Sequence, residues 1–583
     1  MPTYIRLTDY KSSDEKEQEF FNPENRYEAE QEKFSKIPSS PFAYWISNNA
    51  SDSFSKGFKI KELAKVRVGM HTGSNDKFIR YWHELGFETI GLGCDSEELT
   101  KSLESKWYPY NKGGGFRKWF GNNEYVVNWY KGGISIHQFH NIPLTHNGAP
   151  VRAKALQFKE SITWSFVSSS SFAVRYSPAG FMFDVGGSSL FPEKLPVYSF
   201  VSFLCSKVAF SLLKILNPTM NFQVGNISSL PIIQSNSEII IQQIEILTQQ
   251  NIDTAKEEWD SRETSWDFTK NELIKHKSDT KIETAYTSFC NYWKEQHNTL
   301  HQNEEELNRL FIDIYELQDE LTPDVELKDI TILKNEAKIV DNELVFQADE
   351  IMKQFISYGV GVMFGRYSLD SDGLLIANMG QEVPTDTTFE IDDDNVIPVL
   401  EDDYFKDDIA SRFVQFVKAT FGEEDLSQNI RFIENSLGTT LRKYFVKGFY
   451  EDHIKRYKKR PIYWMVASPK KGFMACMYMH RYTSDIFATI QNDYLREYIT
   501  KLENNNENLQ RLADDESNSS IERSKATKNI DKSKKILDEI SRFDSDSLTK
   551  FAQSTIDIDL DDGVKVNYCK FKDILFPISG LCK

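Results

Sequence analysis

A short polar loop between two strand-like runs holds the first residues whose types suit contact with nucleic acid. Gly69 and Gly73 flank the loop, and glycine lets a backbone approach a partner closely. Arg, His, Thr and Asn side chains supply donors and acceptors that match base edges and phosphates. The plain alternative is a polar turn, because the same residue types commonly build turns. The candidate DNA contacts here are Arg67, His71, Thr72, Asn75 and Asp76.

A second candidate segment places three glycines, 113–115, among aromatic and basic residues. No Gly-Lys-Ser/Thr follows them, which excludes a nucleoside-triphosphate loop. Interleaved aromatic and basic side chains can stack on bases and bind the DNA backbone. An aromatic mini-core with a glycine turn explains the segment equally well. The candidate contacts are Lys112, Arg117 and Lys118.

Three later segments, at 161–165, 172–184 and 217–227, add candidates by residue type. Asn217-Pro218 lacks the second proline and the aromatic residue with which amino-methyltransferases hold a flipped adenine. The stretch 217–226 is therefore expected to be a loop after a helix, without a catalytic role. The candidate DNA contacts are Thr163, Trp164, Ser165, Arg175, Asn217, Asn221 and Gln223.

A basic run at 452–460 is expected to be a helix that ends before Pro461. Pairs at i,i+4 would then place the cations on one ridge. Such a ridge suits DNA phosphates, although a solvated charged face is the default explanation. The candidate phosphate contacts are Lys455, Arg456, Lys458, Lys459 and Arg460.

No catalytic, cofactor-binding or metal-ligating residue is predicted. His297 and His301 have i,i+4 spacing but lack the Glu of H-E-x-x-H, so we expect them at the surface. No G-x-S-x-G nucleophile motif occurs.

Length and charge set the frame for these candidates. The 583 residues exceed what one hydrophobic core supports, so several domains are expected. The net charge of −18 argues against a general nucleic-acid coat protein. The charge is uneven, however: residues 381–430 carry 14 acidic and three basic residues, whereas 441–482 carry 11 basic and two acidic ones. A cationic surface within an acidic chain is therefore possible.

The positions of turn residues and apolar periodicity predict an α+β multidomain protein. The expected parts are a connecting arm (1–56), an α+β domain (57–235), a helical domain (236–380), an acidic then basic α+β domain (381–485), and a helical hairpin with a C-terminal tail (486–583). The apolar stretch from Ser199 to Leu216 is expected to be one core helix and not a membrane span, because Lys207 and Lys214 interrupt it.

The six cysteines are far apart and form no C-x-x-C, which predicts neither a disulfide framework nor a zinc ribbon. The N-terminus has no apolar segment typical of a secretory signal. We therefore expect a reducing, cytoplasmic environment.

Several longer motifs together resemble the PglX family, the adenine-specific DNA methyltransferases of BREX phage-defence systems. They include N-P-T-M-N-F-Q-V-G and H-I-K-R-Y-K-K-R-P-I-Y-W, and the resemblance runs along essentially the whole chain. The matching segments are 65–84, 106–129, 162–165, 217–225, 259–268, 306–323, 363–370 and 453–464.

The resemblance is to the C-terminal part of that family, and it implies that residues 57–235 are a TaqI-like specificity domain. Long helices, a mixed basic α/β region and a C-terminal helical hairpin would follow. The family's glycine-rich S-adenosylmethionine loop and Asn-Pro-Pro-Tyr are not in this sequence, so that cofactor is expected only on a separate methyltransferase domain. The chain would be the target-recognition portion of an enzyme that marks host DNA, and inactive alone.

The resemblance implies double-stranded DNA and other BREX proteins as partners, and no membrane. Two alternatives stay open. The chain could be one subunit of a split methyltransferase that needs a separate catalytic chain. It could also be a scaffold that binds other defence proteins through its acidic segment and its hairpin.

Overall fold

Two four-stranded sheets between residues 58 and 232, here called the sheet unit, carry most of the candidate contacts. The structure is a computed structural model that describes residues 1–167 and 171–582. The apolar runs expected to be strands are strands, and the chain is an α+β multidomain protein as predicted. One sheet has the order β10 (Met182–Phe183), β6 (Trp107–Asn111), β7 (Tyr125–Asn128), β5 (Ile79–Tyr81); the other has β4 (Ala64–Arg67), β11 (Ser189–Pro192), β8 (Ser161–Trp164), β9 (Val174–Ser177). Only the β10–β6 pair is parallel in these two sheets, among the described residues.

The apolar stretch expected to be one core helix is two helices. α7 (Val197–Cys205) and α8 (Lys207–Leu216) meet at an angle of 73°. Between them Ser206 accepts a hydrogen bond from the N–H of Ala209, which starts the second helix and explains the break. Within the described residues no single helix is long and apolar enough to cross a membrane. α7 and α8 reach that length and apolar composition only when the two helices are counted together.

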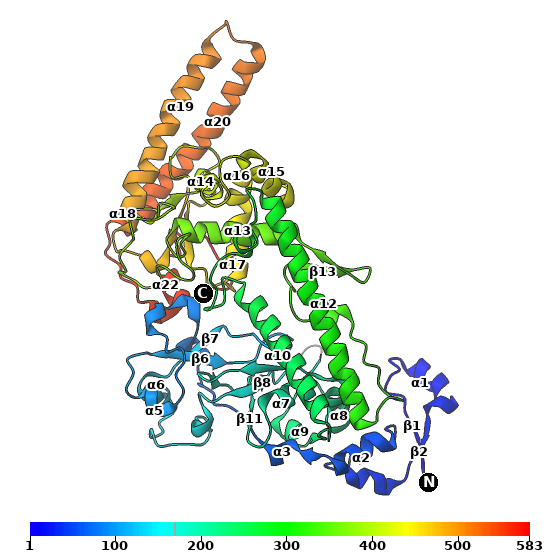
Figure 1. Ribbon diagram of the computed structural model, residues 1–583. Helices are drawn as coiled ribbons and strands as arrows, with labels where there is room; N and C mark the ends of the chain where they lie inside the picture. Colours follow the sequence, from blue (N-terminus) through cyan, green and yellow to red (C-terminus); the bar gives the residue numbers. More distant parts are fainter. Residues whose placement is uncertain (168–170, 583) are drawn as a thin grey trace.

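Two long helices connect the sheet unit to the rest of the chain. α10 (Glu238–Asp260) packs on α7 and on α12 (Ile282–Tyr315), which runs from the C-terminal half to the N-terminal segment (Figure 1). In α12 the apolar side chains of Leu307, Leu310 and Phe311 are buried. His297 of the same helix is only 2% exposed, so the prediction that it lies at the surface was wrong. In α10 Ile244 is buried, whereas Ile239, in the first turn, is 77% exposed.

The C-terminal half is built around a small sheet and ends in a projecting hairpin. The sheet has the order β15 (Ile397–Pro398), β17 (Met474–Tyr478), β16 (Tyr463–Ala467), and the helices α13 (Ala348–Met363) and α14 (Ile409–Phe421) also belong to this half. α19 (Arg496–Asp514) and α20 (Ser520–Phe543) pair as an antiparallel hairpin that extends away from the body (Figure 1).

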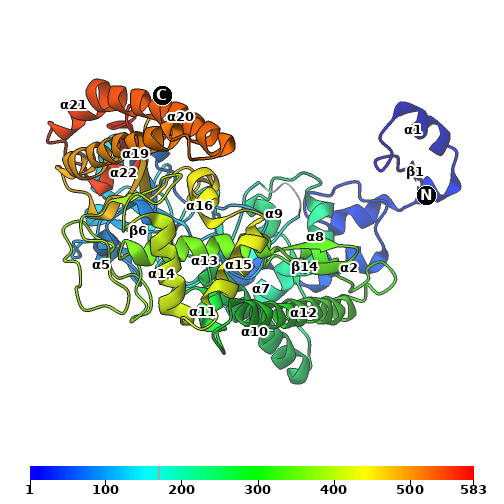
Figure 2. The same cartoon turned by 90° about the horizontal axis from the view of Figure 1, so that it is seen from above.

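The N-terminal segment is joined to the body through α2 (Asn48–Lys56). The Asn49 amide donates to the carbonyl of Glu316, which follows α12, and Lys56 pairs with the Glu316 carboxylate. The preceding residues, with β1 (Thr3–Ile5), α1 (Ser13–Glu19) and β2 (Arg26–Glu28), lie apart from the body (Figure 2).

The cysteine pattern departs from the expectation at one place. Cys569 and Cys582 form a disulfide, with Cα atoms 5.5 Å apart, whereas the other four cysteines are free. The prediction of no disulfide was wrong because separation in sequence does not give separation in space. Here α22 (Gly563–Cys569) and the C-terminal segment meet.

The acidic segment is partly internal. Asp392 is 6% exposed, and its carboxylate accepts from the N–H of Val396, as does the Asp394 carboxylate. Tyr494, just before α19, donates to Asp394 and Asp407. Burial, followed by the nearby Asp394 carboxylate, raises the pKa of Asp392 to about 8. Some of these acids therefore bind the hairpin's base instead of forming an external acidic surface.

Replacing Asp392 by Asn is expected to change the pH dependence of stability. The folded protein holds a proton on Asp392 that the unfolded chain releases near pH 4, so the free energy of unfolding falls as pH rises from about 4 towards 8. Asn cannot ionise, and its side-chain oxygen still accepts from the Val396 N–H. The free energy of unfolding of the variant should therefore fall less with rising pH, and above pH 8 the variant should be more stable than the unchanged protein. Urea unfolding from pH 5 to 9 measures this, with the exposed neighbour variant Asp393→Asn as control. Identical pH profiles for Asp392→Asn and the unchanged protein would contradict the assignment.

Candidate nucleic-acid interface

Five loops of the sheet unit meet along one edge, here called the rim: 68–76, 112–116, 165–167, 184–188 and 217–223. Three of these loops approach neighbouring backbone closely at a glycine. A Cβ on Gly69 would lie 2.1 Å from the carbonyl oxygen of Phe183. A Cβ on Gly187 would lie 2.2 Å from the carbonyl oxygen of Asn111. A Cβ on Gly113 would lie 2.6 Å from the Gly186 oxygen. Gly69 thus lets its loop approach the end of β10 and the start of the 184–188 loop, and a close approach to DNA at this glycine stays a prediction.

Replacing Gly69 by Ala is expected to destabilise the protein by about 1–3 kcal/mol, the usual cost of overpacking. The added methyl would meet backbone atoms of Phe183 and Asp184, which cannot turn aside as a side chain can. Gly225→Ala is the control, because nothing lies within 4 Å of its Cβ position, and it should change stability by about 0.5 kcal/mol or less. Urea unfolding of both variants measures the difference. Equal effects would show that the crossing is looser than described.

Hydrogen bonds hold the rim loops together. The Ser165 hydroxyl donates to the Gly114 carbonyl at 2.9 Å, and the Phe222 N–H donates to the Phe166 carbonyl at 2.8 Å. Lys112 Nζ lies 3.0 Å from an Asp184 carboxylate oxygen. The rim is thus a pre-formed polar edge, as sequence-reading loops require.

Many predicted contacts are accessible on or beside the rim. Asn217 is half-buried, and its side chain is used locally: its amide donates to the Asn221 carbonyl and its oxygen accepts from Thr219. Thr72 is buried and donates to the Asn75 side-chain oxygen. The exposed members are Arg67, His71, Asn75, Asp76, Asn221 and Gln223, and the half-buried ones are Lys112 and Ser165.

His71, on the rim, faces His140, which follows α6 (Tyr130–Phe139). The His71 and His140 rings are 5.6 Å apart and perpendicular, and His140 Nε2 lies 3.0 Å from the Thr72 carbonyl. Burial, and then the nearby His140, lower the pKa of His71. A neutral imidazole carries one donor and one acceptor, which suits hydrogen bonding to a base edge.

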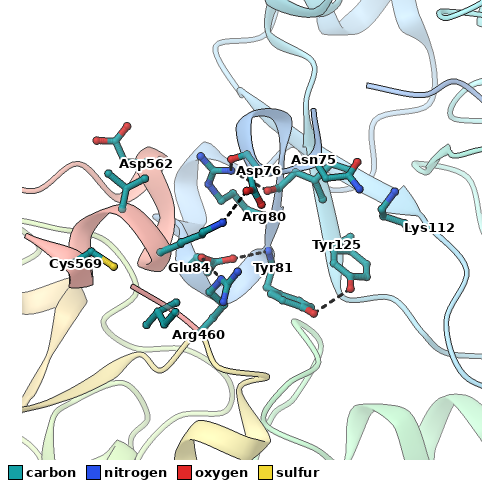
Figure 3. Close-up of a pocket in the computed structure, with 14 residues that line it drawn as sticks. Asn75, Asp76, Arg80, Tyr81, Glu84, Lys112, Tyr125, Arg460, Asp562 and Cys569 are labelled. Atoms are coloured by element: carbon teal, nitrogen blue, oxygen red, sulfur yellow. Dashed lines mark hydrogen bonds and ion pairs between the residues drawn. The ribbon is translucent and has the colours of Figure 1, made fainter. Parts of the chain in front are cut away.

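A groove of about 480 Å³ continues from one end of the rim. It is lined by Asn75, Asp76, Lys112 and Arg460, so it joins candidates from three separate segments of the sequence. Figure 3 shows these residues beside Tyr81 and Tyr125, whose hydroxyls are 3.0 Å apart. The C-terminal half supplies Asp562, Lys565 and Cys569.

Two groove residues were missed by the sequence analysis. Arg80 donates to the carbonyls of Asp76 and Ile79 and covers the Trp107 ring, and Lys565 pairs with Asp76 at 2.7 Å. That hydrogen bond with Lys565 lowers the pKa of Asp76. Arg80 ends the same motif as Asn75 and could have been included. Lys565 is nearly 500 residues away in sequence, and no local pattern relates it to the groove.

Glu84, at the base of the groove, has a structural role. It accepts N–H groups from Tyr81 and Val564 at 2.9 and 2.8 Å, and Arg460 lies 3.8 Å away. Burial raises the pKa of this carboxyl, and its backbone contacts oppose that shift. It therefore joins the sheet unit to α22.

Three predicted contacts lie inside the sheet unit. Trp164, Thr163 and Arg175 are each at most 2% exposed. Trp164 donates to the Phe222 carbonyl and Thr163 to that of Gly187, so both support rim loops from below. Burial, and then the Arg117 charge, lower the pKa of Arg175 to about 10. The prediction that these three side chains contact DNA was wrong. Both faces of their strands are covered by other parts of the protein, so side chains on either face are buried.

Arg117 and Lys118 are also internal. Arg117 lies 2.6 Å from Glu258 of α10, and Lys118 lies 2.6 Å from Glu304 of α12. The adjacent Trp119 donates to the second oxygen of Glu304 at 2.8 Å. The aromatic mini-core that competed with the DNA-contact interpretation is therefore the better description of these residues.

The basic run does not form the expected ridge. α17 (Tyr450–Arg456) ends four residues early, and Lys458 and Lys459 have left-handed backbone angles, so the i,i+4 pairs are not made. Arg456 pairs with Glu263 and Lys458 with Glu124, which joins the basic run to two other segments. Lys459 donates to the Ser579 carbonyl, and Lys455 is exposed. The run mainly holds the two halves of the chain together.

Comparison with known proteins gives the context for this geometry. No family model matches the chain. The adenine-specific methyltransferase PglX of Lacticaseibacillus casei (strain Zhang) is 36% identical over 601 residues, covering 97% of this chain and 48% of the relative. Nearly the whole chain is thus similar to one half of this PglX methyltransferase. The adenine-specific methyltransferase BrxX of Escherichia coli O9:H4 (strain HS) is 34% identical and covers 100% of this chain and 48% of the relative. The chain spans about half the length of the curated relatives it matches.

The residues described do not fit an S-adenosylmethionine site of the kind such methyltransferases imply. Asn217 is held in a turn by Thr219 and Asn221, and Met220 stands where the motif requires an aromatic residue. The three glycines at 113–115 follow β6, but they lead to the buried Arg117 and not to a helix N-terminus that could bind the cofactor. No methyl-transfer step is derived from this chain.

Proposed function

We propose that the chain is the sequence-specific DNA-recognition portion of a BREX-type, site-specific adenine-N6 DNA methyltransferase. In this proposal the sheet unit is a TaqI-like specificity domain. The observation that carries the proposal is the rim, where five loops meet, through close approaches at glycines and through hydrogen bonds, and present polar side chains together. The similarity to half of two adenine-specific methyltransferases supports the same assignment.

Side chains on the rim would read base edges. His71, Asn75, Asn221 and Gln223 are exposed there, and amide side chains pair well with adenine in the major groove. Lys112 and Arg80, at the groove, would bind phosphate and fix the position of the duplex, since phosphate contacts position and base contacts specify.

Fluorescence anisotropy with a labelled duplex tests the proposal. We expect binding that weakens steeply between about 50 and 200 mM salt, as counterion release requires. Absence of salt-dependent binding would reject the proposal.

The catalytic step belongs to a second part of the enzyme in this proposal. A separate methyltransferase domain would supply S-adenosylmethionine, and other BREX proteins would be partners in host DNA marking and phage defence. Mixing the chain with such a domain and measuring tritium transfer to DNA tests this. Transfer by that domain at the same rate and sites without the chain would contradict it.

A further inference from the structure

The hairpin of α19 and α20 carries a basic surface that the rim does not explain. In α20, which packs against α19, the buried side is formed by Ala526, Ile530, Ser533 and Ile540. Lys525, Lys528, Lys532 and Lys535 follow at intervals of three and four residues, so they share one face of the helix. Arg542 continues the same row. These five side chains are here called the α20 stripe.

The stripe retains its positive charge. Lys525, Lys528, Lys532, Lys535 and Arg542 are all exposed. Lys532 pairs with Glu401, but both side chains are more than half exposed, so solvent screens the pair and it is weak. Glu539 lies on the same face but binds the turn after β16, accepting from the Ser468 hydroxyl and the Lys470 N–H. Lys470, Lys535 and Arg542 line one hollow at the hairpin's base, together with Asp538 and Asp546.

The form of the stripe favours a polyanion with regularly spaced charges. Neighbouring lysines are separated by about 5 Å along the helix axis, and a DNA strand presents one charge per about 3.4 Å of its axis. Between residues 525 and 542, all of which the structure describes, no large hydrophobic side chain is exposed. A stable protein interface would require such an anchor at its centre. Long lysines without an anchor suit phosphate contacts that carry no sequence information.

We propose that the α20 stripe binds the phosphate backbone of the DNA duplex whose sequence the rim reads. This inference rests on the proposed function and extends it to a second contact surface. The hairpin would then act as an arm that increases affinity without changing sequence preference.

The experiment compares three full-length proteins in duplex-binding titrations at several salt concentrations. The test variant is Lys528→Gln/Lys535→Gln, because Gln keeps much of the side-chain length and a similar helix propensity. The control is Lys338→Gln/Lys534→Gln, which removes the same charge from β13 (Ala337–Val340) and from another face of α20. Equal melting temperatures establish that all three are folded.

We expect the slope of log affinity against log salt to fall by about 2 in the test variant, since each lost phosphate contact removes about 0.9. The control should keep the slope of the unchanged protein. A test variant with an unchanged slope, or a control that loses as much, would overturn the inference while leaving the proposed function in place. An unchanged protein that binds no duplex would overturn both.

Discussion

Replacing Glu258 by Ala is expected to lower the free energy of unfolding by about 3–5 kcal/mol, the cost of leaving buried charges without their partner. The Glu258 side chain is 1% exposed and pairs with Arg117 of the rim segment and with Arg262. It also accepts the Leu333 N–H at 2.8 Å. Its loss leaves Arg117 with only carbonyl partners and leaves the Leu333 N–H unpaired.

Urea denaturation measures the effect, with Glu326→Ala as the matched control. Glu326 pairs with Lys328 at the surface, where both side chains are 69% exposed and screened by solvent, so its removal should change stability far less than the loss of Glu258. A loss of stability in Glu258→Ala no larger than in the control would show that Arg117 is not held by this pair. Because Arg117 follows the 112–116 loop, the destabilised variant should also bind DNA more weakly.

Combining Asn75→Ala with Gln223→Ala is expected to remove most of the DNA sequence preference. The two side chains are exposed in different rim loops, and each well-made contact to a base contributes about 1–3 kcal/mol of discrimination. Two such contacts together contribute about 2–6 kcal/mol, so the double variant should lose about 30-fold or more of its preference for the recognised sequence over random duplex. Binding to random duplex should stay within about twofold, because the phosphate contacts are intact.

Competition between specific and random duplexes measures this ratio. Gln242→Ala, an exposed glutamine of α10 outside the rim loops, is the control and should leave the ratio unchanged. An unchanged ratio in the double variant would exclude both side chains from sequence reading.

Much of the architecture follows from local patterns. Period-2 runs and turn residues predict the strands of the sheet unit, and helical spacing predicts α12, because both depend on neighbours in sequence. Ser206 shows the limit of such patterns. It lies beside Lys207 within a largely apolar stretch that predicts one helix, yet its hydroxyl caps α8 and splits that helix.

The exposure of candidate side chains is predicted better in the loops than for the charged residues, and their contact with DNA stays a prediction. Asn75 and Lys112 lie together at the groove, but nothing local indicates Lys565, whose carboxylate partner Asp76 is distant in sequence. The same limit explains Arg117 and Lys118. The sequence does not show whether a basic residue binds phosphate or pairs with a buried glutamate from another helix. The basic run at 452–460 likewise pairs with acids from two other segments.

Selection from a library of random duplexes tests the central claim most directly. The chain is incubated with the library, and bound DNA is sequenced over several rounds. The account predicts enrichment of one short sequence, with specific binding about 10³-fold or more tighter than binding to random duplex at physiological salt. Bound DNA with the same sequence distribution as the starting library would contradict it, even if the chain bound every duplex tightly.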